Sequence, residues 1–169
     1  MKQLLFIITL AALLASCSKS APPPFRGQLR ELIPQQVGDF KLTGEIKPLD
    51  IAQGERPSGA LRPTEGATAR YETPMGSQLN LQVVNYLSAA DAEQALKQMD
   101  ENIRDLKNGA KVTEGTRTGG AGGAAGRKIV VEGLAPGVHS VMWVGNSSVL
   151  YLASGADLKV ILEFEQKLP

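Results

Sequence analysis

Residues Gln78 to Lys107 read QLNLQVVNYLSAADAEQALKQMDENIRDLK and carry the two clearest structural signals in the chain. In the first part, Leu79, Leu81 and Val83 alternate with polar residues, which predicts a strand with one buried face. In the second part, apolar residues recur every three or four positions, which predicts a helix that begins at the N-cap Ser88. The expected apolar stripe of this helix is Ala92, Leu96, Met99, Ile103 and Leu106.

The segments on either side predict further strands joined by short turns. Further strands are expected around Phe40 and at Ala67–Glu72, Lys111–Thr118, Arg127–Leu134, Val138–Val144 and Ser147–Ser154, with short or closing helices at Arg26–Ile33 and Asp157–Leu168 and a loop at Ile51–Gly66. Tight turns imply antiparallel pairing, and a helix with one apolar stripe needs a sheet face to cover it. The sequence therefore predicts an α+β, two-layer domain, with a mainly antiparallel sheet and two principal helices packed on it. The Ser88 helix is expected to cover Leu79, Leu81 and Val83 together with the C-terminal strands.

The positions of Trp143 and Tyr151 depend on the register of the last predicted hairpin. Gly145 and Asn146 suit a two-residue turn, which would place Trp143 opposite Ser148. In that register Trp143 and Tyr151 lie on opposite sheet faces, and we expect Trp143 in the core because indole burial stabilises small cores.

The N-terminal residues predict a signal for export. Lys2 is followed by an apolar run from Leu4 to Leu14 and then by Ala15, Ser16 and the chain's one cysteine, Cys17. The run has the length of the apolar region of a signal peptide and is too short to span a bilayer. The stretch Leu14-Ala15-Ser16-Cys17 resembles the lipobox of bacterial lipoproteins.

This resemblance implies that the chain is cleaved before Cys17, which then carries a diacylglyceryl (palmitate-type) anchor. The expected organisation is a signal peptide at 1–16, a lipidated Cys17 with a Pro-rich tether at 17–24, and one α+β domain at 25–169. Ser18 stands where an inner-membrane retention signal of enteric lipoproteins would have Asp. We therefore expect the protein to lie at the periplasmic face of the outer membrane in a Gram-negative cell. The lipid bilayer is then one of its partners, through the acylated Cys17.

Composition and motifs argue against several other functions. A formal charge of +1 over 169 residues gives no footprint for nucleic acid. The Gly-rich stretch Gly119–Gly126 is followed by a strand pattern and not by the helix that a dinucleotide site requires, so it is interpreted as a hairpin loop. His139 is the one histidine, and Ser140 beside it would point to the other sheet face. No cofactor, metal or catalytic residue is predicted.

Three function classes remain open at this point. The first is a non-catalytic envelope lipoprotein that binds a partner protein or supports an envelope assembly. The second is a carrier or sensor of a small apolar ligand held between sheet and helices. The third is an enzyme whose site the sequence does not reveal, for example one that processes cell-wall glycans. The tentative binding surface and the oligomeric state are left unassigned.

Overall fold

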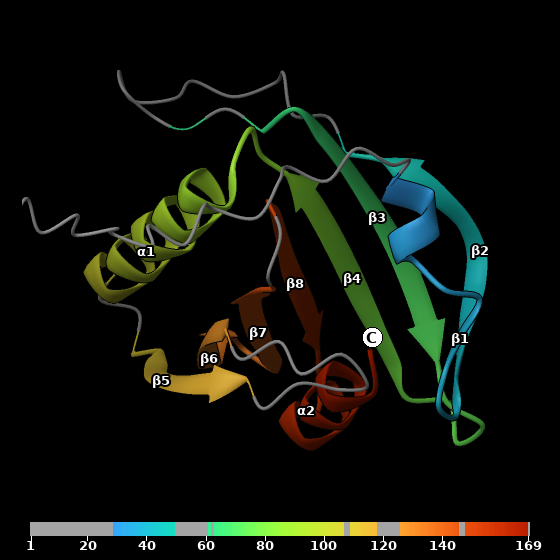
Figure 1. The fold of residues 1–169 in the computed structure, drawn as a ribbon. Helices are drawn as coiled ribbons and strands as arrows, with labels where there is room; N and C mark the ends of the chain where they lie inside the picture. The colour runs from blue at the N-terminus through green and yellow to red at the C-terminus, as the bar shows by residue number, and fades with distance from the viewer. Residues whose placement is uncertain are drawn as a thin grey trace, which may run out of the picture.

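The central feature of the protein, seen in a computed structural model, is an eight-stranded antiparallel sheet in the order β1-β2-β3-β4-β8-β7-β6-β5 (Figure 1). The structure describes residues 29–49, 61, 63–106, 109–117, 126–145 and 148–168. The elements are η1 (Leu29–Leu32), β1 (Gln36–Val37), β2 (Phe40–Pro48), β3 (Glu65–Glu72), β4 (Gln78–Asn85), α1 (Ala89–Asp105), β5 (Lys111–Arg117), β6 (Gly126–Ala135), β7 (Val138–Val144), β8 (Val149–Gly155) and α2 (Leu158–Lys167).

The strand and helix at the centre of the sequence form as predicted. β3 pairs with β4 in one continuous register from Glu65 opposite Asn85 to Glu72 opposite Gln78. Ser88 caps α1, since its side-chain oxygen accepts a hydrogen bond from the backbone N–H of Asp91 at 3.1 Å. The predicted α+β class, with its mainly antiparallel sheet and two packed helices, is confirmed.

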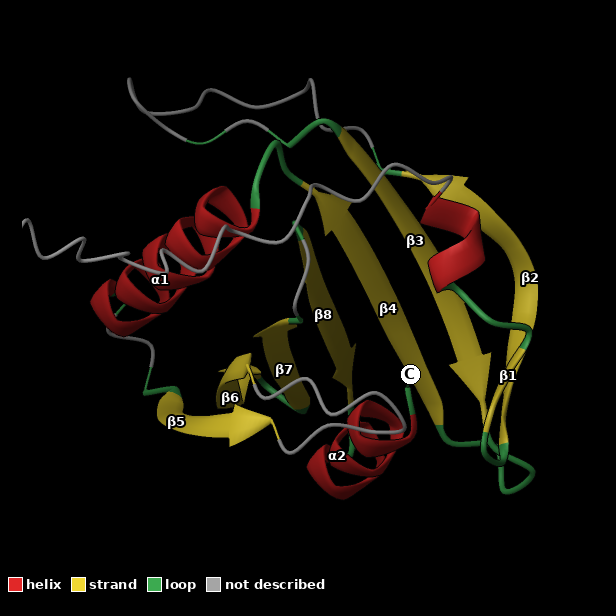
Figure 2. Ribbon diagram, in the orientation of Figure 1, coloured by secondary structure: helices red, strands yellow, loops and turns green. Residues whose placement is uncertain are grey.

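The two helices cover opposite faces of the sheet, where the sequence predicts two layers. One core joins η1, β3, β4 and α2, whose ribbons are shown in Figure 2, and it contains the β7 residues Val141 and Trp143. The other core joins α1, β6 and β8 and contains Met142 and Val144, which alternate with the first pair. Because both faces of β7 are apolar and buried, each face requires its own helix.

The predicted partners of α1 are therefore correct for the C-terminal strands β7 and β8 and wrong for the predicted face of β4. Leu79, Leu81 and Val83 do share one buried face, but that face belongs to the α2 core. The stripe of α1 also ends earlier than predicted, because Leu106 is its C-cap residue and is 59% exposed.

The register of the last hairpin also differs from the prediction. Val144 pairs with Leu150 and Trp143 with Tyr151, so the connection is longer than two residues. The physical reason is that Ser148 is tied to the other neighbour of β8: its hydroxyl donates to Asn85 Oδ1 at 2.7 Å, and its carbonyl accepts from Tyr86 N–H. The register moves by an odd number of residues, which brings the two aromatic residues to the same face.

The remaining elements agree with the sequence in most respects. β5 is a polar strand at one edge of the sheet, and α2 begins at the N-cap Asp157 and buries Ile161, Phe164 and Leu168. Trp143 is fully buried, as predicted. The predicted N-terminal helix is represented by the single 3-10 turn η1, and the predicted loop at Ile51–Gly66 falls largely outside the described residues, although Glu65 and Gly66 already belong to β3.

Candidate functional site

A groove of about 410 Å³ lies between α1 and the central strands β4 and β8. Its α1 wall is a stripe from Ala95 to Asn102, about 10 Å long at 1.5 Å rise per residue. The lining residues are Leu49, Leu61, Pro63, Gln82, Val84, Tyr86, Ala95, Gln98, Met99, Asn102, Leu150 and Leu152. The groove thus draws on five separate parts of the chain.

The position of α1 on the sheet creates this groove. Ala92 and Leu96 are fully buried in the core that includes β6 and β7. On the same side, the guanidinium of Arg127 on β6 donates to Asp100 Oδ2 at 3.1 Å and to Glu114 Oε1 at 2.8 Å. These contacts hold α1 toward the β5 edge of the sheet. Its other flank, which carries Gln98, faces β8 and β4 and leaves the groove open.

The lining combines apolar surface with neutral hydrogen-bonding groups. Val84, Leu150, Leu152 and Met99 supply apolar contact surface. The polar side chains include three carboxamides, Gln82 from β4 with Gln98 and Asn102 from α1, and no described residue hydrogen-bonds them. None of the described lining residues is Asp, Glu, Lys, Arg or His. This arrangement can hold a neutral molecule, and its described lining carries no side chain that is charged at neutral pH.

A second hollow of about 300 Å³ lies on the same sheet face between β2, β3 and β4. Its lining is polar and includes Lys47, Arg70 and Asn80. The pairing of β2 with β3 shifts register between Thr43 and Lys47, and such bulges bend a strand and dent the surface. We therefore interpret this hollow as a consequence of the bulge.

An ionic cluster is buried on the opposite face, beneath α2. Arg117 Nε donates to Glu165 Oε1 at 3.0 Å, and Lys128 Nζ donates to Glu165 Oε2 at 3.0 Å. Arg117 also donates to the carbonyl oxygens of Glu165 and Leu168 at the end of α2. Its guanidinium carbon lies 5.6 Å from the centre of the Trp143 ring. Each charge is paired within the cluster, so these groups fasten the edge strand β5 to α2.

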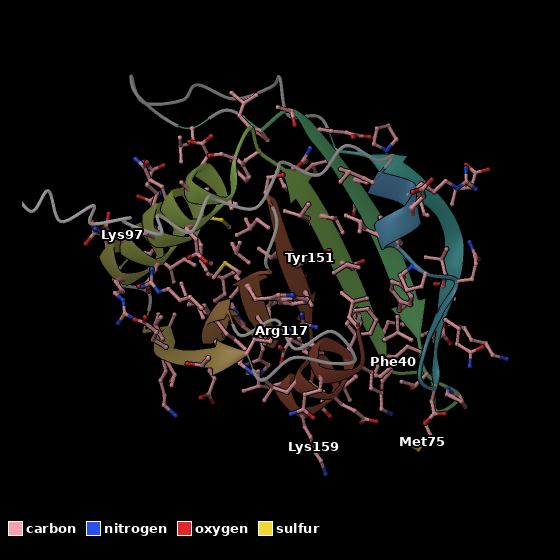
Figure 3. The ribbon with its side chains drawn as sticks, viewed as in Figure 1. Phe40, Met75, Lys97, Arg117, Tyr151 and Lys159 are labelled. Carbon is pink, nitrogen blue, oxygen red and sulfur yellow. The ribbon has the colours of Figure 1, made fainter. Side chains whose placement is uncertain are left out.

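The Trp143 ring stacks on Tyr151 in this core, with centroids 5.3 Å apart. Tyr151 and Arg117 are labelled in Figure 3. Burial raises the pKa of Tyr151, and the positive charge of Arg117 opposes part of that rise. Burial also raises the pKa of Tyr71, whose hydroxyl donates to the carbonyl of Pro34 at 2.7 Å. Both tyrosines therefore stay neutral and act in packing.

Several charges around α1 are likewise paired. The hydrogen bond from Arg127 holds the pKa of Glu114 below its usual range, and the same bond raises the pKa of Arg127. Burial raises the pKa of Glu93, although Arg127 lowers it in part. Arg104 Nε donates to Asp100 Oδ1 at 2.7 Å, so Asp100 is shared between α1 and β6. This network positions the helix beside the groove.

The residues singled out from the sequence for a possible function are not among the described lining residues of the groove. Cys17 and the tether 17–24 fall outside the described residues, as does the Gly-rich stretch except for Gly126 at the start of β6. His139 Nδ1 accepts a hydrogen bond from the Gly133 backbone at 3.3 Å, which supports the β6–β7 connection. Ser140 is 1% exposed, and no described residue hydrogen-bonds its hydroxyl.

The sequence analysis missed the groove residues. Gln82 stands on the polar side of an alternating strand, and Gln98 and Asn102 flank the apolar stripe of α1. Such positions are ordinarily solvated, and only the fold shows that they converge. A flank of the helix enriched in carboxamides rather than charges was the one available signal.

Within the described ranges, no three His, Cys, Asp or Glu side chains gather closely enough to hold a metal ion. Among the helices in the same ranges, none is long and apolar enough to cross a membrane.

Comparison with known proteins gives one structural likeness. No family model matches the chain, and no curated protein matches it. The fold is similar to the crystal structure of a protein described as a GTP binding regulator from Thermotoga maritima, with a TM-score of 0.50 and 17% sequence identity. The similarity covers 87% of this chain and 94% of that chain. At this identity the likeness shows the fold alone, since one fold hosts many functions.

Proposed function

We propose that this protein is a lipid-anchored lipoprotein of the cell envelope whose domain is non-catalytic and binds a small molecule in the groove beside α1. The observation that carries the binding function is the lining of that groove, in which apolar side chains surround three carboxamides that no described residue hydrogen-bonds. Sites for small molecules are concave, mostly apolar and furnished with a few polar groups, and they measure about 300–1,000 Å³. The groove meets each of these criteria.

The ionisable groups of the described chain support a non-catalytic function. Glu165 serves two cations at once, and Asp100 is shared between Arg104 and Arg127. Groups committed to one another in this way stabilise packing and are poorly suited to exchange protons with a substrate. The groove contains no Asp, Glu, Lys, Arg or His among its described lining residues.

The Thermotoga protein is described as binding GTP. A nucleotide carries several negative charges, and no described lining residue of the groove is cationic. We therefore do not extend that ligand to this chain.

The anchoring part of the proposal depends on Cys17 and the lipobox that it ends. Two or three acyl chains on one residue hold a protein on a bilayer almost permanently, whereas one chain binds reversibly. Replacing Cys17 by Ser should release the protein from the membrane fraction and abolish the lipid mass on its N-terminal peptide. A Cys17→Ser protein that remains in the membrane fraction would contradict the anchor.

The binding part is tested with a photocrosslinking amino acid placed at one α1 position at a time in living cells. At position 98 the group faces the groove, whereas at position 97 it lies on the solvent side, where the native side chain is 66% exposed. Mass spectrometry of the irradiated protein should find a small-molecule adduct of defined mass at position 98 and none at position 97. Equal labelling at both positions would mean that the groove does not concentrate a ligand.

A partner protein is the second candidate. The face of β2, β3 and β4 that carries Thr43, Arg70 and Asn80 is exposed and polar, and no described helix covers it. In the same crosslinking experiment, a protein adduct from position 70 would favour this candidate.

A further inference from the structure

The geometry of the groove points to its ligand class, provided that the proposed binding function is correct. We propose that the groove accepts uncharged amphipathic molecules, with an apolar part up to about 10 Å long and a neutral polar group. It discriminates against anions of the same shape.

The apolar part of the ligand would lie on the sheet. Val84 projects from β4, and Leu150 and Leu152 project from β8. The two strands pair with Val84 opposite Leu150 and Gln82 opposite Leu152. These side chains form one contiguous apolar floor. Met99 on α1 faces the floor, and its flexible thioether adapts to ligands of different outline.

The polar group of the ligand would meet the carboxamides. Gln98 and Asn102 are four residues apart on α1 and so lie one helical turn from each other, while Gln82 stands on β4 across the groove. A carboxamide offers both donors and acceptors, so three of them match neutral amides, hydroxyls or amines.

Charge is the property that the groove excludes. A charge that enters an apolar site without a partner loses its hydration and gains nothing comparable. None of the described lining residues is Lys, Arg or His, which would be needed to compensate an anion such as a carboxylate or sulfonate. Asp100 on α1 and Arg127 on β6 are paired with each other.

Two dyes of nearly identical shape provide the test. N-phenyl-1-naphthylamine is neutral and has one N–H donor, whereas 8-anilino-1-naphthalenesulfonate is the same ring system with an added sulfonate. The full-length protein is purified from membranes in a mild detergent and titrated with each dye against the same detergent without protein. The neutral dye should bind with one site and at least tenfold more tightly than the sulfonate.

A groove-filling variant assigns the binding to this site. Leu152 is only partly buried and lines the groove, so Leu152→Trp should fill the space and weaken binding of the neutral dye at least tenfold. A urea titration confirms that the variant is folded. Unchanged dye binding in the folded variant would place the site elsewhere and overturn the proposal.

A change of charge at the groove tests the selectivity directly and does not depend on filling the space. Gln98→Lys adds a cation beside the groove and removes one of its carboxamides, so it should raise the affinity for the sulfonate at least tenfold and should not raise that for the neutral dye. Gln166→Lys adds the same charge at an exposed position of α2, the helix on the opposite sheet face, and should change neither affinity.

The outcomes separate this proposal from the proposed function. If the sulfonate binds as tightly as the neutral dye and Leu152→Trp weakens both, the groove binds ligands but the charge selectivity is refuted. If neither dye binds while position 98 still captures a small molecule in cells, the ligand class is wrong and the binding function stands. If position 98 captures nothing, the binding function itself fails.

Discussion

Replacing Glu165 by Gln would leave two largely buried cations, Arg117 and Lys128, without the carboxylate that they share. The Glu165 side chain is 1% exposed, and those of Arg117 and Lys128 are 6% and 16% exposed. The amide of Gln has nearly the shape of the carboxylate, so the substitution removes the charge and changes the packing little. It therefore isolates the electrostatic contribution of the cluster.

The expected loss follows from the partners that remain. Breaking a buried ion pair by removing one member costs about 3–5 kcal/mol. Arg117 would keep its bonds to the carbonyl oxygens of Glu165 and Leu168, and the new amide can still accept one hydrogen bond. We therefore expect the lower end, about 3 kcal/mol, which is a large share of the roughly 5–15 kcal/mol that stabilises a domain.

Urea unfolding followed by tryptophan fluorescence measures this loss. Trp143 is the one tryptophan of the chain and lies against Arg117, so its emission reports on the same core. Glu163→Gln is the matched control on α2, because Glu163 binds Lys167 at the surface, where a pair contributes about 0–1 kcal/mol. Equal losses in the two variants would refute the reasoning, since the buried carboxylate would then contribute no more than an exposed one.

Three further substitutions test the packing around α1 and β6. Leu96→Ala should lower the free energy of unfolding by about 2–5 kcal/mol because Leu96 is fully buried, whereas Lys97→Ala should have little effect. Gly126→Ala should cost about 1–3 kcal/mol because its Cβ would overlap the Val144 carbonyl oxygen, whereas Gly115→Ala on β5 meets open space and should be neutral in the same urea assay. Burial raises the pKa of Glu93, so the folded state binds the carboxyl proton more tightly than the unfolded chain does. Glu93→Gln should therefore raise the urea midpoint at pH 7, where the carboxylate is charged. The gain should be lost as the pH falls through the raised pKa toward the ordinary value of a Glu side chain.

The elements with a strong local signal were predictable from the sequence. The alternation of Leu79, Leu81 and Val83 correctly separates the two sides of β4, and Ser88 correctly marks the start of α1. These features depend on backbone periodicity and on one side chain that bonds a backbone N–H three residues away. No tertiary contact is needed to specify them.

The errors arise where tertiary contacts outweigh a local signal. Gly145 and Asn146 favour a two-residue turn, but Ser148 bonds Asn85 on β4 and draws the chain into a longer connection. The sequence of β7 does indicate that the helices lie on both faces of the sheet. Its uninterrupted apolar run from Val141 to Val144 indicates that both faces of the strand are buried.

The groove lay beyond sequence reasoning because it results from where α1 stops covering the sheet. The core stripe of the helix, with Ala92 and Leu96, determines which face α1 buries, and the pairing of Asp100 with Arg127 determines how far it lies toward β5. The apolar residues Val84 and Leu152 are left only partly buried as a result. A helix seated one strand closer to β4 would bury both and leave no groove. The candidate site is thus a property of the helix position. A fully solvated helix flank is usually charged, whereas the flank of α1 that lines the groove carries neutral carboxamides.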